Sequence, residues 1–143
     1  MMGTVYETIT IKNLRDIDAV ELGVKNEQEI RQATVKAVVD TGAPTLFVTE
    51  ELSQQLGLKV IGEKPVSIAN GTNVIAKRLE GVELHWEDRY MICHPYILTG
   101  GNEILLGAIP MEDMDLIVDP LKEELVGAHG DREVHRMVGF RLC

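Results

Sequence analysis

The sequence has few of the features that mark secreted or membrane proteins. It contains only two cysteines, Cys93 and Cys143, among 143 residues, which is too few for a framework of disulfide bonds. Its most apolar stretch, residues 104–111, is far shorter than the roughly 20 residues that a transmembrane helix needs. The first residues lack the basic and then apolar order of a secretion signal. We therefore expect a cytoplasmic protein that makes no contact with a membrane.

Basic residues are in the minority as well. The chain has 14 lysines and arginines against 23 aspartates and glutamates, which gives a net charge of −9. Nucleic acid and anionic lipid would repel such a chain at long range, so we expect neither as a partner. The apolar fraction of 45% and the charged fraction of 26% are those of a soluble folded protein. The length suits a single domain over residues 1–143.

Apolar and polar residues alternate along much of the chain, which is typical of β-strands. In the first such segment, residues 5–11, one face is formed by Val5, Glu7, Ile9 and Ile11. The predicted strands are residues 5–11, 32–39, 82–86, 89–93, 116–118 and 125–126, and the last four form two hairpins. The pattern therefore predicts a mostly β domain.

Two short segments have the signs of helices instead. Residues 49–58 begin with Thr49 as a cap, carry acidic residues in the first turn and pass through Gly57 near their end. Residues 108–115 can form a second short helix, because Pro110 is tolerated in a first turn. The segment from residue 13 to residue 30 stays open between a helix and a polar loop.

One segment stands out as a source of chemistry. Asp40, Thr41, Gly42 and Ala43 follow directly on the predicted buried strand 32–39. The strand thus ends in a carboxylate, and the glycine lets a substrate approach the backbone closely because it has no Cβ atom. The same residue types are also common in an ordinary turn that ends a strand. The surrounding segments have to decide between these two interpretations.

Further segments follow in a characteristic order. Residues 66–74 contain Asn70-Gly71, which is typical of a hairpin tip, and the predicted hairpin 82–93 comes next. An apolar pair and a glycine, residues 105–107, then lead into the second predicted helix. Together with Asp-Thr-Gly-Ala, this order resembles the single-domain retropepsin-like aspartic proteases of clan AA. Among them it is more similar to the bacterial relatives of retroviral proteases than to the viral enzymes.

The resemblance is strongest over residues 31–126. It implies a small closed β-barrel of the acid-protease type with two short helices, active as a homodimer. Residues 1–30 and 127–143 would be strand arms or extensions at the dimer interface.

The family resemblance also implies a mechanism. An aspartic protease needs two facing carboxylates, whereas this chain has one Asp-Thr-Gly and is too short for two lobes. Each of two copies would therefore contribute Asp40 to a site on the two-fold axis. The pair would share one proton, and the ionised member would activate a water molecule that attacks a peptide bond. The implied partners are a second copy and a peptide or protein substrate, and no cofactor is implied.

Other residues receive roles from the same resemblance. The active-site loop that contacts substrate would be completed by Thr41, Gly42 and Ala43, and it would be supported by Leu105, Leu106 and Gly107. A flap that closes over bound peptide would be formed by Ile68, Ala69, Asn70, Gly71 and Thr72. Taken alone, however, this hairpin is more typical of an ordinary surface turn.

Two positions depart from the viral pattern. Viral enzymes usually have Asp after Asp-Thr-Gly-Ala and Arg after the apolar-apolar-Gly segment, and these two residues pair near the dimer interface. This chain has Pro44 and Ala108 at those positions. Because both charged partners are absent together, no charge is left unpaired. Other contacts must then hold the dimer, and strands at residues 5–11 and 138–143 are candidates.

Metal chemistry finds little support in the sequence. The candidate ligands have no spacing that is typical of a metal site, so no metal is expected; they are His85, Cys93, His94, His129, His135 and Cys143. Two alternatives to a dimeric protease stay open. One is a peptide-binding or dimerisation module that has the same fold and cleaves nothing. The other is a half-enzyme that needs a different partner chain.

Overall fold

A computed structural model describes residues 4–67 and 70–129 of the chain. The first part contains β1 (Val5–Asn13), α1 (Leu14–Glu21), the single 3-10 turn η1 (Glu27–Glu29), β2 (Gln32–Val39), β3 (Leu46–Phe47) and α2 (Glu50–Gln55). A set of strands follows: β4 (Val60–Ser67), β5 (Asn73–Leu79), β6 (Val82–Trp86), β7 (Arg89–Cys93), β8 (Tyr96–Leu98) and β9 (Leu105–Leu106). The last elements are α3 (Ala108–Asp113), β10 (Leu116–Asp119) and β11 (Glu124–Gly127).

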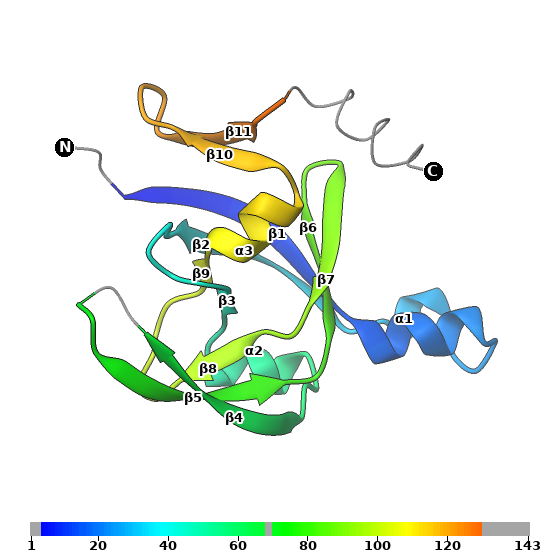
Figure 1. The fold of residues 1–143 in the computed structure, drawn as a ribbon. Coiled ribbons are helices and arrows are strands. Elements are labelled where there is room, and N and C mark those ends of the chain that lie inside the picture. Colours follow the sequence, from blue (N-terminus) through cyan, green and yellow to red (C-terminus); the bar gives the residue numbers. More distant parts are fainter. Residues whose placement is uncertain (1–3, 68–69, 130–143) are drawn as a thin grey trace, which may run out of the picture.

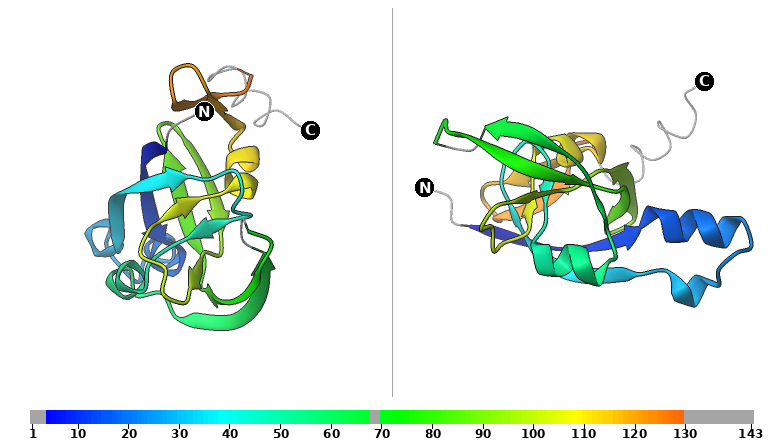
Figure 2. Two further views of the ribbon diagram at one scale, coloured as in Figure 1. Left: turned by 90° about the vertical axis from the view of Figure 1, so that its left-hand side faces the viewer. Right: turned by 90° about the horizontal axis from the view of Figure 1, so that it is seen from below.

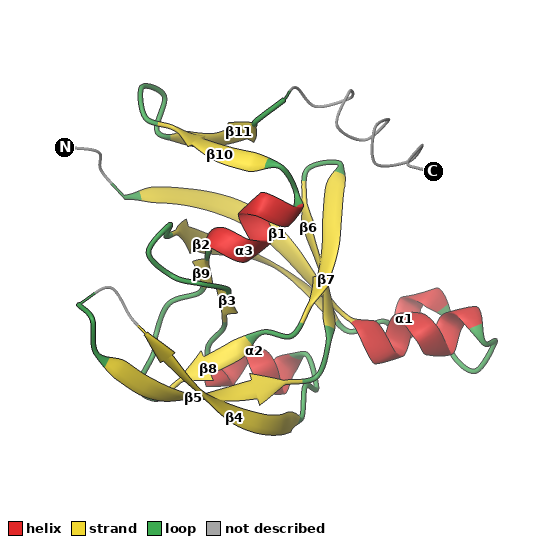
Figure 3. Cartoon of the chain, in the orientation of Figure 1, coloured by secondary structure: helices red, strands yellow, loops and turns green. Residues whose placement is uncertain are grey.

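Nine strands form one curved sheet in the order β4-β5-β8-β3-β9-β2-β1-β6-β7, and β10 and β11 form a separate hairpin. The helices lie outside this sheet (Figure 3). The prediction of a mostly β domain is confirmed, and so are the predicted strand 32–39 and the hairpin of strands 82–86 and 89–93. No helix of the described segments is long and apolar enough to cross a membrane.

The sheet does not close into a barrel. Among the described strands, β4 and β7 stand at opposite ends of the order and do not pair with each other. The prediction of a closed β-barrel is therefore wrong. A physical reason lies in β4, where the register shifts between Val60 and Gly62 and where Pro65 has no N–H to donate. Both features interrupt a regular ladder on a strand.

The prediction of two short helices is wrong in number, because α1 is a third. The two predicted helices are found as α2 and α3, and the Thr49 side chain caps α2 as expected by accepting a hydrogen bond from the Leu52 N–H (3.1 Å). The additional helix begins after Asn13, whose side chain accepts a hydrogen bond from the Asp16 N–H (3.0 Å). It occupies part of the segment that the sequence left open.

Strand β1 lies inside the sheet, between β2 and β6 (Figure 1). Val5, Ile9 and Ile11 are buried as the alternation predicts. Glu7 shares their face because both of its carboxylate oxygens have partners: the Trp86 indole N–H (3.0 Å) and the Leu125 backbone N–H (3.0 Å). β1 is thus an internal strand that also binds the β10–β11 hairpin, rather than a free arm. The other proposed arm, residues 138–143, lies outside the described residues.

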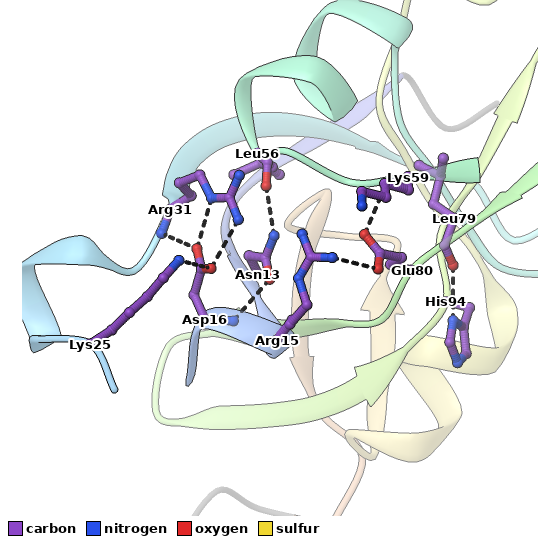
Figure 4. Close-up of polar contacts among 10 residues, drawn as sticks. All are labelled: Asn13, Arg15, Asp16, Lys25, Arg31, Leu56, Lys59, Leu79, Glu80 and His94. Atoms are coloured by element: carbon purple, nitrogen blue, oxygen red, sulfur yellow. Dashed lines mark hydrogen bonds and ion pairs between the residues drawn. The ribbon is translucent and has the colours of Figure 1, made fainter. Parts of the chain in front are cut away.

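The helix α1 and the turn η1 extend from the body of the fold, as Figure 2 shows in its right-hand view. This extension, residues 14–31, is attached through Asp16, whose side chain is only 1% exposed. The Asp16 carboxylate accepts hydrogen bonds from the Arg31 backbone N–H (2.9 Å), from Arg31 Nε (2.8 Å) and Nη2 (2.9 Å), and from Lys25 Nζ (2.7 Å) (Figure 4). The buried Asn13 adds a hydrogen bond from Nδ2 to the Leu56 carbonyl (2.8 Å).

These contacts make the charge of Asp16 structurally important. The hydrogen bonds and positive charges of Arg31 and Lys25 outweigh burial and hold the pKa of Asp16 well below its usual range. A carboxyl group whose pKa is lower in the folded than in the unfolded chain stabilises the fold above its unfolded pKa of about 3.9. That contribution is lost as the pH falls through the acidic range.

We expect Asp16→Asn to lower the free energy of unfolding at pH 7 by about 2–4 kcal/mol, because it leaves two cations beside a neutral, buried amide. Urea denaturation at pH 7 and at about pH 3 measures this, with the exposed Asp18→Asn on the same helix as control. The difference from wild type should shrink at the lower pH. A difference that is equally large at both values would contradict this role of the charge.

Candidate active site

Asp40 lies directly after β2, where two parallel strands end together. Val38 and Val39 pair with Leu105 and Leu106 of β9, and the Asp40 N–H donates to the Leu106 carbonyl (3.0 Å). The carboxylate turns back onto its own loop, because Asp40 Oδ1 accepts a hydrogen bond from the Gly42 N–H (2.9 Å). Such a contact to the backbone two residues on is typical of an Asp-stabilised turn. It fixes one oxygen of the carboxylate and leaves the other available.

The active-site loop, residues 40–43, is held by backbone contacts rather than by other side chains. The Ala43 N–H donates to the Asp40 carbonyl (3.1 Å), which closes the turn. Asp40 is half-buried, Thr41 and Gly42 are exposed, and Ala43 is buried. The hydroxyl of Thr41 and the backbone of Gly42 are therefore open to a substrate or to another chain.

The start of α3 holds the other side of the loop. The Ala108 N–H donates to the Ala43 carbonyl (2.8 Å), and the Ile109 N–H donates to the Pro44 carbonyl (3.1 Å). Gly107 lies so close that a Cβ atom there would stand 2.3 Å from the Thr45 carbonyl oxygen and 2.5 Å from that of Ala43. No side chain can be accommodated at this distance. At the positions where viral enzymes have Asp and Arg, this chain thus joins loop and helix by main-chain hydrogen bonds.

The predicted flap is a hairpin of β4 and β5, with pairing from Val60↔Leu79 to Ser67↔Asn73. Near its tip, the Thr72 N–H donates to Asn70 Oδ1 (2.9 Å), and Gly71 has a φ of +82°, which favours glycine. Asn70, Gly71 and Thr72 are exposed. Ile68 and Ala69, which also belong to the predicted flap, lie outside the described residues.

A second apolar cluster connects this hairpin to the active-site loop. Its buried members are Ala43, Phe47, Val66, Ala76 and Tyr96, and Leu105 packs against them. The cluster thus contains a residue of the loop, a residue from each strand of the hairpin, and residues of β3, β8 and β9. The half of the hairpin nearer its tip, where Val66 pairs with Val74, is therefore packed on the same residues that support the loop.

Sequence reasoning missed most of this cluster. Phe47 and Tyr96 lie in strands of two and three residues, β3 and β8, which pair in parallel with each other. Strands this short have no alternation that a sequence pattern can reveal. The available signals were two short apolar runs, Leu46-Phe47-Val48 shortly after the Asp40 loop and Tyr96-Ile97-Leu98.

The histidines and the half-buried cysteine take part in separate contacts. His85 Nε2 lies 2.6 Å from Glu83 Oε1, His94 Nδ1 donates to the Leu79 carbonyl (2.9 Å), and His129 Nδ1 lies 2.8 Å from Asp115 Oδ1. Burial raises the pKa of Cys93 to about 12, so its thiol is an unreactive, neutral group. Within residues 4–67 and 70–129, no three side chains of the metal-binding types gather at one place. His135 and Cys143 lie outside the described residues.

A sequence model of the family described as aspartyl protease matches residues 26–124, which is more than half of the chain. The chain belongs to the aspartyl protease family. The matched region includes the Asp40 loop, the hairpin and the start of α3. The retropepsin-like resemblance predicted from the sequence is thereby confirmed.

Two solved structures were compared with this chain, and the one with the higher TM-score shows the same fold. The retroviral protease-like domain of Ddi1 from Leishmania major matches with a TM-score of 0.53 and 15% identity, over 88% of this chain and 89% of that chain. A retropepsin-like aspartic protease from Rickettsia conorii matches with a TM-score of 0.44 and 20% identity, over 83% of this chain and 90% of that one. The first likeness shows the fold. No curated protein matches the sequence.

We expect Gly107→Ala to destabilise this aspartyl protease by about 3 kcal/mol or more, because the added methyl group meets two backbone carbonyls that cannot move independently of the Asp40 loop. Thermal unfolding measures the effect. Gly62→Ala is the matched control, since a Cβ atom there has no neighbour within 4 Å. Equal melting temperatures for the two variants would show that the loop yields to the methyl group.

Proposed function

We propose that this protein is an aspartic endopeptidase that cleaves peptide bonds as a homodimer, with Asp40 of each subunit at a shared active site. The observation that carries the proposal is the setting of Asp40. Its carboxylate leaves the end of a paired strand on a loop that is hydrogen-bonded to β9 on one side and to the start of α3 on the other. Such a loop presents a carboxylate in a fixed position, as acid–base catalysis requires.

The need for a second subunit follows from the chemistry. The sequence has one Asp-Thr-Gly, at residues 40–42, and a single carboxylate cannot act as base and acid in the same step. Two copies related by a two-fold axis supply the same residue twice. One Asp40 is then ionised and its counterpart protonated, because two carboxylates in contact cannot both carry a full charge.

In the proposed reaction, the ionised Asp40 takes a proton from a water molecule as its oxygen attacks the scissile carbonyl carbon. The partner subunit's Asp40 donates a hydrogen bond to the carbonyl oxygen, which carries the growing negative charge. The bond between carbon and nitrogen then breaks as the nitrogen receives a proton from the carboxyl pair. The products are a carboxylic acid, which then ionises in water, and a free amine, and the two carboxyl groups again share one proton.

The exposed residues of the loop and the hairpin fit the remaining tasks. Thr41 is open to a hydrogen bond with the same loop of the second subunit, and Gly42 offers its carbonyl group to a substrate backbone. The hairpin tip at Asn70 and Gly71 would cover bound peptide and exclude water. The substrate is an unfolded segment of a peptide or protein, and we place the activity in the cytoplasm.

A surface next to the loop supports dimerisation on this side. Ile109 is 58% exposed although it is a large apolar residue, and its N–H donates a hydrogen bond to the carbonyl of Pro44, the residue that follows the active-site loop. Apolar side chains beside an active-site loop are well placed to be covered by a second copy. The main-chain hydrogen bond between Pro44 and Ile109 fixes the position of this surface relative to Asp40.

Cleavage should depend on Asp40. We expect the wild-type protein to cut an unstructured peptide library between about pH 4 and pH 8, and mass spectrometry of the products measures this cleavage. We expect Asp40→Asn to reduce the cleavage by about 10²–10⁴-fold or more. The amide retains an oxygen that can accept the hydrogen bond from Gly42, so the melting temperature should stay close to that of wild type. Asp18→Asn serves as the control.

Three results would contradict this proposal in different ways. Equal cutting by wild type and Asp40→Asn would place the activity elsewhere. No cutting by dimeric wild type would favour a peptide-binding module of the same fold. A protein that stays monomeric and inactive, but cuts when a different chain is added, would be a half-enzyme.

The dimer surface is tested separately. We expect Ile109→Asp to raise the dissociation constant of the homodimer by about tenfold or more, because it places a charge in an apolar contact. Analytical ultracentrifugation over a range of protein concentrations measures this, and specific activity should fall in parallel on dilution. Leu22→Asp is the control, since Leu22 is 79% exposed and lies at the end of α1, away from the loop. Equal dissociation constants for both variants would exclude this surface.

A further inference from the structure

The connection between β8 and β9 lines two hollows. The smaller hollow, of about 160 Å³, is lined by Phe47, Val48, Leu98 and Leu105 together with Asn102 and Glu103. The larger, of about 250 Å³, shares Asn102 and Glu103 but is also lined by Lys36 and Tyr6. An engineered apolar cavity of about 150 Å³ holds a benzene molecule. The smaller hollow therefore has room for one side chain.

The smaller hollow lies next to the active-site loop. Leu105 pairs with Val38 of β2, two residues before Asp40. Leu105 and Phe47 also face each other in the β3–β9 register, and both belong to the second apolar cluster with Ala43. A peptide that crosses the Asp40 loop can thus place a side chain in this hollow.

The walls of the smaller hollow combine apolar surface with one charge. Four of its lining side chains are apolar, and among the described residues that line it Glu103 is the only charged one. Glu103 is exposed, and the part of the chain that the structure describes provides no hydrogen bond or ion pair to its carboxylate. Long side chains with an apolar stem and a cationic end match this arrangement, because the stem is buried while the charge stays near the surface.

We infer that Glu103 makes this hollow a subsite for a lysine or arginine side chain of the substrate, so that the protein prefers peptides with a basic residue near the cleaved bond. This inference rests on the proposed function, whose substrate class it specifies. The net charge of −9 adds a general attraction for such peptides. Lys36 does not oppose the preference inside this hollow, because it lines only the larger one, where its Nζ lies 6.0 Å from the centre of the Tyr6 ring.

The test uses positional peptide libraries in which one position is fixed as lysine, methionine or glutamate and the others are mixed. Methionine is the neutral comparator, since it is unbranched and of similar length. Cleavage is measured with wild type, and binding is measured by fluorescence anisotropy with Asp40→Asn. Both measurements are repeated with Glu103→Gln and Glu103→Lys, and with Glu21→Gln as a control that removes the same charge from the end of α1.

We expect lysine pools to be favoured over methionine pools by about threefold to fivefold at one position, which is the range of a partly exposed ion pair. Glu103→Gln should remove this ratio, Glu103→Lys should favour glutamate instead, and Glu21→Gln should retain the wild-type ratio. This result would support the subsite. A preference that responds equally to Glu103→Gln and Glu21→Gln would overturn it, because the preference would then follow net charge alone.

The arms of the experiment separate this inference from the proposed function. Cleavage without any lysine preference would overturn the subsite and leave the protease activity standing. Binding that depends on Glu103, without cleavage by any pool, would support the subsite and overturn the activity. Absence of both binding and cleavage would overturn both.

Discussion

The structure depends most on a contact that leaves no room for a side chain. Gly107 lies against the carbonyl groups of Ala43 and Thr45, so the start of α3 can donate its first N–H groups directly to the loop that carries Asp40. On the other side, the parallel pairing of β2 with β9 binds the Asp40 N–H. A larger residue at position 107 would separate helix and loop. The position of the carboxylate is therefore determined by backbone packing.

The second apolar cluster extends this control to the hairpin. Val66 and Ala76 belong to its two strands, and Ala43 belongs to the loop. Val66 lies one residue pair from the end of the β4–β5 ladder, so this packing reaches close to the exposed Asn70, Gly71 and Thr72. The hollow beside Glu103 adjoins the same cluster, because Phe47 and Leu105 line both. The Asp40 loop, the β4–β5 hairpin and the hollow beside Glu103 thus share one set of apolar residues.

The sequence predicts elements whose signals are local and misses those that depend on distant residues. Thr49 marks the start of α2 because a cap is read within one turn. The sequence pattern did not predict α1, because the most buried side chain of this helix is Asp16 and its partner Arg31 lies 15 residues further along the chain. A closed barrel was also predicted, whereas the sheet is open, since closure of the sheet depends on details of its edge strands such as Pro65 in β4. The Asp40 motif is visible in the sequence, whereas the hollow beside Glu103 exists only after the short strands have paired.

The open sheet leaves two edges that differ in their resistance to unwanted association. Strand β4 carries a register shift, Pro65 and the neighbouring charges of Glu63 and Lys64, all of which discourage another chain from adding a strand. Strand β7 has no register shift and no proline, its one charged residue, Arg89, is buried, and it exposes Tyr90 and Ile92. A partly unfolded or highly concentrated sample therefore has its weak point at β7. The edge at β4 is thus protected from aggregation by its own residues. The edge at β7 is protected only by the negative net charge of the molecule, which keeps copies of the protein apart.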